Sequence, residues 1–360
     1  MKYCHQFCDG CDGNLYFGTA SGLFRLDSEG IVERLSIDGV LNNSICDVFV
    51  DREGYLWVGT FDNGVYYANL GASPFAHLAS DLFVGTTRGL VMSDDGTLWV
   101  ASDPVGLLKY KDGEWSEIDT MEEYKFQGAF YDEVTKELFI GNWEGMVRFD
   151  PGSGKHRLIR FADDISIGSR IPVLAVRRCG EELYIASTIG AFLFNPEVED
   201  RISRRVEGVD KRVNAIVVTD TDQIFFAGEG LYLFSGGHAE YLEGYRDITF
   251  SDCIQSSDGS LWGAMYGCLI RIDNVGQRAV FDMDSCGFPR TSVNYICPAP
   301  DGRIVAGTSK GITILDPSAR HCMTYDRFNG LRFKSTWNGK PLCLPDGTLL
   351  LGGNGDIEKL

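Results

Sequence analysis

The stretch LWVGTFDNGVYYAN, residues 56–69, decides the fold because variants of it recur along the whole chain of 360 residues. Each copy has an apolar triplet, then Gly or Ala, a small residue, a short turn that ends in Gly, and a second apolar stretch. The copies begin near residues 15, 56, 98, 138, 183, 224, 261, 304 and 349. Nine copies at a nearly constant period indicate a repeat architecture.

Each copy also has flanking strands. It is preceded by an alternating stretch that ends in an acidic turn with Gly, as in DVFVDREG (47–54) and ICPAPDG (296–302). Such turns favour antiparallel hairpins, because Gly readily adopts a positive φ. A fourth strand follows, as in HRLIRF (156–161). Four short antiparallel strands per repeat are typical of a propeller blade. We therefore predict an all-β fold, a single β-propeller domain over residues 1–360.

The number of blades depends on how the two ends of the chain are used. The stretch LFVGTTRGL (82–90) resembles the repeated phrase. We assign this stretch to the lead-in of the third repeat, because counting it as a separate copy would break the period. The ninth repeat (341–360) has three of its four strands. Residues 2–8 are a candidate for the missing strand, although this would leave the first blade without its inner strand. We predict one ring of nine blades, with eight as the alternative.

The composition narrows the classes of partner. The net charge of −18 argues against binding to nucleic acid, and it also argues against docking on an anionic membrane surface. No run of apolar residues is long enough for a membrane span, and the first residues lack the pattern of a signal peptide. The eleven cysteines are scattered singly, so we expect no disulfide framework. This usage fits a reducing cytosol, or an export compartment without oxygen.

Three cysteines near the start of the chain, Cys4, Cys8 and Cys11, have a spacing found in iron–sulfur enzymes. No alternating strand–helix pattern follows them, as a radical enzyme would need. Cys8 instead aligns with Cys297 in another lead-in strand, where cysteine acts as a small apolar residue. Together with His5 the cysteines offer four ligands, but an extended strand cannot bring these around one zinc ion. We predict neither a metal site nor a cofactor.

The second repeat, DGVLNNSICDVFVDREGYLWVGTFDNGVYYAN (38–69), resembles the two-component regulator propeller repeat. The matching positions are Gly39, Leu41, Asn43, Ile45, Val48, Asp51, Gly54, Leu56, Trp57, Gly59, Thr60 and Gly64. Weaker matches cover nearly the whole chain, and residues 328–360 resemble the last repeat of such sensors. The resemblance implies the periplasmic sensor portion of a hybrid histidine kinase that responds to glycans. Two departures are the absence of a signal peptide and of a downstream kinase or membrane helix in this chain.

A propeller carries the turns between its second and third strands, together with the links between blades, on one face around its axis. Aromatic rings there can stack on the apolar face of a sugar, while amides and charged groups hold its hydroxyls. Trp143, Tyr266 and Trp337 are the candidates for stacking, although packing within a surface turn explains Trp143 equally well. The full set of predicted ligand-binding residues is Phe61, Asp62, Asn63, Trp143, Glu144, Arg170, Tyr266, Arg290, Asn294, Trp337 and Asn338. The links also contribute Arg212 and Asn214.

Other residues of these types have structural explanations. Trp57, Trp99 and Trp262 lie within strand phrases, where we expect them to pack between blades. The four histidines His77, His156, His238 and His321 fall at or just before the outermost strand of a blade. A histidine pair at the axis is therefore not expected, which argues against a metal-dependent lyase mechanism.

We predict a ligand-sensing propeller that recognises an oligosaccharide, and no enzyme. A scaffold for protein–protein interaction, including a homodimer, is the alternative, and a carbohydrate-active enzyme or lyase is a less favoured one. Carboxylates are abundant, and a pair such as Asp62 with Glu144 is compatible with the two acids of a glycosidase. The glycosidase alternative stays open because the fold alone does not decide the function.

Overall fold

The computed structural model describes the chain except residues 1–3, 11, 36–43, 53, 71–74, 79–84, 119–120, 122–123, 167–169, 274–275, 327–330, 334–335 and 337–338. The regular structure of the described residues consists of β-strands and two one-turn helices, α1 (Asp163–Ser166) and α2 (Met283–Cys286). The strands form nine antiparallel sheets, eight with four strands and one with three. The all-β fold and the nine predicted repeats are thereby confirmed. None of the described helices has the length and apolar character needed to cross a membrane.

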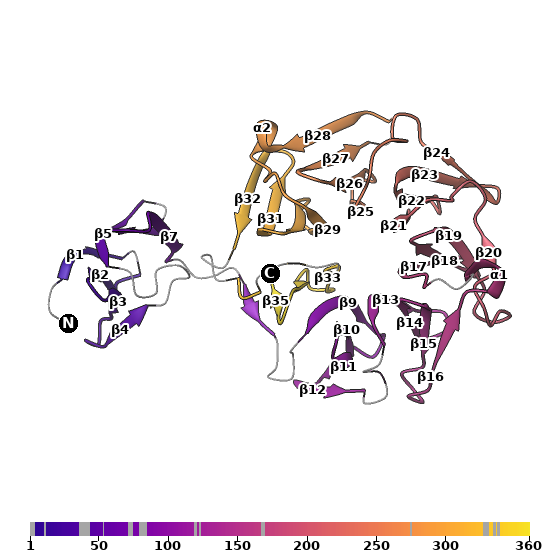
Figure 1. Cartoon of the computed structure of the whole chain (residues 1–360), viewed down its shortest axis with the longest axis horizontal. Helices are drawn as coiled ribbons and strands as arrows, with labels where there is room; N and C mark the ends of the chain where they lie inside the picture. The colour runs from indigo at the N-terminus through magenta and orange to yellow at the C-terminus, as the bar shows by residue number, and fades with distance from the viewer. Residues whose placement is uncertain are drawn as a thin grey trace. The chain divides into compact units, whose positions relative to one another are not determined.

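The nine sheets are divided between two compact units. The first unit comprises Met1–Ala76 and Tyr325–Arg332, and the second comprises His77–Thr324 and Phe333–Leu360. Two sheets lie in the first unit. The sheets of the second unit number seven and follow one another around a ring (Figure 1). The ring in the structure thus contains seven blades, which differs from the nine expected in one ring.

The first unit contains the first two repeats. Its four-stranded sheet consists of β1 (Cys4–Asp9), β2 (Leu15–Thr19), β3 (Gly22–Leu26) and β4 (Val32–Leu35). Its three-stranded sheet consists of β5 (Ile45–Val50), β6 (Tyr55–Thr60) and β7 (Val65–Asn69).

In the second unit each blade contributes one strand to the lining of the axis. These inner strands are β9 (Thr86–Met92), β13 (Phe126–Asp132), β17 (Val173–Cys179), β21 (Val213–Val218), β25 (Asp252–Gln255), β29 (Val293–Pro298) and β33 (Leu342–Cys343). The second strands are β10 (Leu98–Asp103), β14 (Glu137–Asn142), β18 (Glu182–Ser187), β22 (Ile224–Gly228), β26 (Leu261–Met265), β30 (Ile304–Thr308) and β34 (Leu349–Gly352). With β2 and β6, these second strands account for all nine predicted phrases.

The third and fourth strands of each blade complete the sheets. The third strands are β11 (Gly106–Lys111), β15 (Gly145–Phe149), β19 (Gly190–Phe194), β23 (Gly230–Ser235), β27 (Cys268–Ile272), β31 (Gly311–Asp316) and β35 (Ile357–Lys359). The outer strands are β12 (Glu114–Glu117), β16 (His156–Arg160), β20 (Arg204–Arg205), β24 (His238–Tyr241), β28 (Arg278–Asp282), β32 (His321–Tyr325) and β8 (Ala76–His77). The four histidines predicted at outer strands lie there, as expected.

The repeated phrase has its glycine where neighbouring blades approach most closely. A Cβ atom on Gly141 of β14 would lie 2.2 Å from the carbonyl oxygen of Val173, which begins the inner strand of the next blade. The small hydroxyl residue that follows in other copies supports the turn: Ser187 Oγ donates to the carbonyl of Gly190 at 2.7 Å, and Thr308 Oγ1 donates to that of Gly311 at 3.0 Å. Both features of the phrase therefore follow from blade packing and turn geometry.

The ring closes through the segment that directly precedes its first blade. Strand β8 is the outer strand of the last sheet, in the order β33-β34-β35-β8. The N–H of Leu78 donates to the carbonyl of Ile357 at 3.0 Å, and His77 Nδ1 lies 2.8 Å from Asp356 Oδ1. Leu350 and Ile357 pack in one core with Leu90 from the first blade of the ring. The borrowed strand is thus residues 76–77, whereas residues 2–8 were the candidate; β1 pairs with β2 in its own sheet.

The apolar core lies between adjacent sheets, and tryptophans of the second strands show this clearly. Trp99 and Trp262 are only 4% and 2% exposed, as predicted for residues between blades. Their indole nitrogens each donate to a serine of the preceding turn, Trp99 to Ser93 and Trp262 to Ser256, at 3.1 Å. Trp57 of the first unit differs because it is 41% exposed, so the prediction of its burial between blades is wrong.

Candidate functional site

The turns between second and third strands lie beside the links between blades, as predicted for one face of a propeller. The N–H of Glu229, in the β22–β23 turn, donates to the carbonyl of Arg212 at 2.9 Å. The N–H of Gly267, in the β26–β27 turn, donates to the carbonyl of Thr291 at 2.9 Å. These hydrogen bonds tie two of the turns to neighbouring links. We call the face that carries the turns and links the mouth of the second unit.

Tyr266 lies on this rim, at a pocket of about 610 Å³. We call it the Tyr266 pocket; its lining is Lys211, Arg212, Asn214, Glu229, Arg246, Asp247, Ile248, Thr249, Ser251, Tyr266, Ser292 and Val293. The ring of Tyr266 is 74% exposed. Arg212 donates through Nε to Asn214 Oδ1 at 2.7 Å, and Asn214 Nδ2 donates to the carbonyl of Phe250 at 2.7 Å. The pocket thus combines an exposed aromatic ring with an oriented guanidinium and charges of both signs.

The Tyr266 pocket continues toward the axis. A smaller pocket of about 160 Å³ shares Arg212, Asn214, Ser251 and Val293 with it and adds Gln127, Leu174, Asn294 and Lys340. We call this smaller space the vestibule. The predicted residue Asn294 lies here, and its Nδ2 donates to the carbonyl oxygen of Thr336 and to Thr336 Oγ1, the latter at 3.1 Å. The amide of Asn294 therefore already supports a neighbouring link.

Three further predicted residues meet at a separate pocket of about 350 Å³. Trp143, Glu144 and Arg170 line it together with Tyr124, Lys125, Asn142, Leu158 and Arg160. Glu144 is 3.3 Å from Arg160 Nη2 and 3.7 Å from Arg170 Nε. Trp143 is 43% exposed. We call this the Trp143 pocket; its acid is paired with two arginines.

The remaining predicted residues are not brought to these pockets. Phe61, Asp62 and Asn63 form the β6–β7 turn of the first unit, where the Phe61 ring lies 5.7 Å from that of His5. Arg290 lies on the link before β29 and is 3.4 Å from Asp284. Trp337 and Asn338 lie outside the described residues.

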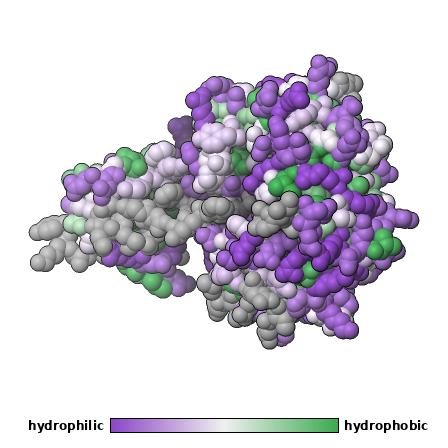
Figure 2. Space-filling view, turned by 45° about the vertical axis from the view of Figure 1, so that its right-hand side comes forward, coloured by the Kyte–Doolittle hydropathy of each residue, from purple (hydrophilic) through white to green (hydrophobic). Residues whose placement is uncertain are grey.

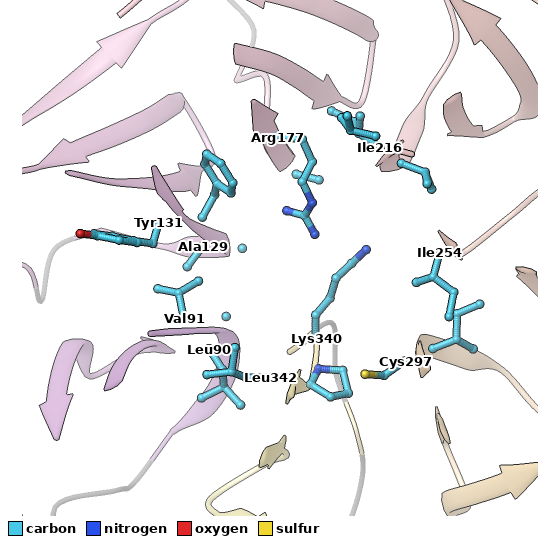
Figure 3. Close-up of a pocket in the computed structure, with 18 of the residues that line it drawn as sticks. Leu90, Val91, Ala129, Tyr131, Arg177, Ile216, Ile254, Cys297, Lys340 and Leu342 are labelled. Carbon is cyan, nitrogen blue, oxygen red and sulfur yellow. The ribbon is translucent and has the colours of Figure 1, made fainter. Parts of the chain in front are cut away.

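The axial channel was missed by the sequence analysis. It has a volume of about 580 Å³ and is lined by residues of all seven inner strands or their flanks. Most of the lining is apolar, but Arg177 and Lys340 project into the channel (Figure 3). Burial raises the pKa of Cys253 and of Cys297, which also line the channel, to about 12, so both are neutral thiols. The signal that could have revealed the channel is a basic residue within an inner-strand sequence, as in VLAVRRC (173–179).

Two groups of possible metal ligands can be assessed. Cys4 and Cys8 lie on the extended strand β1, opposite Thr19 and Tyr16 of β2, while Cys11 is outside the described residues. Ligand atoms of His77, Asp356 and Glu358 lie within 4.8 Å of one another. The pair of His77 with Asp356 joins the closing strand to the residue directly before β35, so it has a structural role. Among the described residues, no histidine lines any of the four pockets.

Comparisons with known proteins fit this architecture. The model of the family described as two component regulator propeller matches residues 39–62. No curated protein sequence matches the chain. The extracellular domain of a hybrid two-component system from B. thetaiotaomicron is 17% identical, with a TM-score of 0.68, over 99% of this chain and 51% of that one. The extracellular domain of a one-component system from the same organism is 16% identical, with a TM-score of 0.62, over 99% of this chain and 52% of that one.

A solved structure with a different printed activity also has a similar fold. A catalytically inactive virginiamycin B lyase from Staphylococcus aureus is 12% identical, with a TM-score of 0.62, over 79% of this chain and 98% of that one. At these identities the structural likeness concerns the fold. The chain spans about half the length of the two B. thetaiotaomicron domains. The resemblance noted in the sequence is confirmed: residues 39–62 are a two-component regulator propeller repeat, and the chain has a fold similar to that of the extracellular domains of these two systems.

Proposed function

We propose that this chain is a ligand-sensing part of the periplasmic domain of a two-component regulatory system, and that it recognises an oligosaccharide at the Tyr266 pocket. The observation that carries the proposal is the exposed Tyr266 ring beside the oriented Arg212 guanidinium. An exposed ring can stack on the apolar face of a pyranose, and charged and amide groups around it can bind hydroxyls.

The pocket has a size suited to this ligand class. At about 610 Å³ it is within the usual range for small-molecule sites. Its acceptors Glu229 and Asp247 and its donors Lys211, Arg212 and Arg246 lie around one aromatic residue. Because the pocket is built from turns and links of adjacent blades, a bound sugar would bridge blades. Signalling would then follow from a change in how the propeller docks on its neighbour in the full receptor.

A thermal-shift screen of the purified chain against plant and host oligosaccharides tests this proposal. A ligand that binds only the folded state raises the melting temperature by mass action. We expect at least one glycan to raise it, Tyr266→Ala to abolish the rise, and Trp143→Ala to leave it unchanged. Trp143→Ala is the matched control, since it removes an exposed aromatic ring from a different pocket of the same mouth. A response lost in the control and retained in Tyr266→Ala would contradict the assigned site, and no response to any glycan would contradict the ligand class.

A further inference from the structure

The axial channel concentrates positive charge in a chain whose net charge is −18. Its lining includes the cations Arg88, Arg177 and Lys340, and one acid, Glu133, which is exposed. Figure 3 shows Arg177, from β17, and Lys340 pointing toward each other across the channel. Hydrophilic side chains, which include acidic and basic ones alike, cover most of the face seen in Figure 2, and the net negative charge means that acids outnumber bases over the whole chain. The basic residues at the axis therefore need an explanation of their own.

Arg177 is the cation that the structure leaves without an acid. Its Nη1 donates to the carbonyl of Val176 at 2.8 Å, and its guanidinium lies 5.9 Å from the centre of the Phe130 ring. Among the described residues no carboxylate lies within ion-pair distance of it. Burial lowers the pKa of Arg177, and the field of Asp252 raises it by less. An arginine stays protonated in proteins, so its charge is retained although the side chain is partly buried.

Two carboxylates beside the channel, Asp252 and Asp132, are already paired with other cations, whereas Glu133 of the lining is exposed to solvent. Asp252 forms an ion pair with Lys340 and accepts a hydrogen bond from the N–H of Ile296 at 3.0 Å. Asp132 accepts from Nε and Nη2 of Arg178, both at 2.6 Å, while Arg178 itself is the neighbour of Arg177 on β17. Neither acid is therefore available to neutralise Arg177.

Arg88 is satisfied only in part. Its Nη2 lies 3.2 Å from Asp103 Oδ2. Its Nε is buried and has no hydrogen-bond partner among the described residues. A buried donor without an acceptor is uncommon in folded proteins and points to a missing partner.

We propose that the axial channel is an anion-binding site in which Arg177, assisted by Lys340 and Arg88, holds a carboxylate or sulfate group. A guanidinium presents paired N–H donors that match the oxygens of such a group. The channel volume of about 580 Å³ is large enough for a small organic acid as well as an inorganic oxyanion. The channel shares Leu174 and Lys340 with the vestibule, which provides a route from the mouth. This site is distinct from the Tyr266 pocket and does not depend on the glycan proposed there.

Thermal shift and calorimetric titration of the purified chain with sodium sulfate and with sodium glucuronate test the site, at constant ionic strength with chloride as the balancing anion. Glucose serves as the neutral control for glucuronate. We expect one or both anions to raise the melting temperature in a saturable way, and glucose to have no such effect. A response to sulfate alone indicates an inorganic oxyanion, and a response to glucuronate alone indicates an organic carboxylate.

The variant Arg177→Met identifies the residue that binds. It keeps much of the side-chain length and removes the charge, so we expect about a tenfold or greater loss of anion affinity. We also expect its melting temperature without anion to equal or exceed that of the parent chain, because a partly buried charge without an acidic partner has been removed. Arg271→Met is the control, since Arg271 forms an exposed pair with Asp258 at 2.6 Å.

Three results would overturn the proposal: no response to either anion, an equal response in Arg177→Met, or an equal loss in Arg271→Met. Tyr266→Ala separates this site from the glycan site, because it should leave the anion response intact. Failure of the glycan screen alone would therefore leave the anion site standing, and the reverse also holds.

Discussion

Lys340, on the link before β33, forms an ion pair with Asp252 at the start of β25, and so connects two blades that are not adjacent in the ring. Asp252 is buried, with 1% of its side chain exposed, whereas Lys340 retains 31%. Asp252 also accepts the N–H of Ile296 on β29. This carboxylate thus joins three parts of the ring at its axis.

Replacing Lys340 by Met should destabilise the second unit, because Asp252 would remain buried without its cation. Loss of one partner from a buried pair costs about 3–5 kcal/mol, and we expect about 2–3 kcal/mol here since Lys340 is partly hydrated. Chemical denaturation measures the change, with Lys310→Met, at an exposed turn, as the control. Adding Asp252→Asn to Lys340→Met should recover part of the loss. Equal stability of Lys340→Met and the control would contradict this role.

Trp57 and Trp262 occupy the same position of the repeat but differ in exposure, at 41% and 2%. Trp57→Phe should therefore lower the acrylamide quenching constant of the chain's tryptophan fluorescence, because an accessible emitter is removed. Trp262→Phe should leave that constant unchanged or raise it, because a protected emitter is removed. Steady-state quenching of the folded variants measures both. An unchanged constant in Trp57→Phe would show that this residue is covered in solution.

Cys286 in α2 and Cys322 in β32 have their sulfur atoms 3.4 Å apart. Burial, followed by the contact with Cys286, raises the pKa of Cys322, so air oxidation should be slow. A thiol oxidant such as diamide should nevertheless join the two sulfurs, with two thiols oxidised and the diazene reduced. Peptide mapping after alkylation should find this pair cross-linked and the exposed Cys4 and Cys343 alkylated. Alkylation of Cys286 and Cys322 in full would contradict the prediction.

Lowering the pH should reduce the folding stability of the second unit, because Asp132 then becomes protonated. Burial alone would raise the pKa of Asp132, but hydrogen bonds from Arg178 and Thr135 outweigh it and leave that pKa below its usual value. A lowered folded-state pKa contributes stability that is present above the unfolded pKa of about 4 and is lost as the pH falls toward the folded value. Arg178→Met should therefore lose stability at pH 7 and show a shallower decrease between about pH 5 and pH 2. If the curves of folding stability against pH ran parallel for the parent chain and Arg178→Met, this role of Asp132 would be contradicted.

The repeated phrases are predictable from the sequence because glycine, hydroxyl residues and apolar triplets each meet a local structural requirement of the blade. Gly141 is required by the close approach of Val173, and Ser187 by its turn, so the pattern repeats with the fold. The closing strand is different. Residues 76–77 carry no repeat signature, since β8 has only two residues and depends on pairing with the distant β35.

The candidate site was predictable only in part for a similar reason. Turn positions such as Tyr266 and Trp143 follow directly from the repeat, and the structure places both at pockets. Arg177 lies on an inner strand whose pairing register shifts between Val173 and Ala175. Such a bulge changes which side chains face the axis, so simple alternation along the strand does not reveal that Arg177 points into the channel.

Hydrogen–deuterium exchange with and without the glycan that gives the largest thermal shift tests the central claim most directly. Binding at the Tyr266 pocket should slow exchange in the β26–β27 turn (266–267) and in the link at 246–251, because both segments contribute to the pocket. The β14–β15 turn at the Trp143 pocket should exchange at the same rate in both states. Protection confined to other segments, or no protection at the Tyr266 pocket under saturating ligand, would contradict the account.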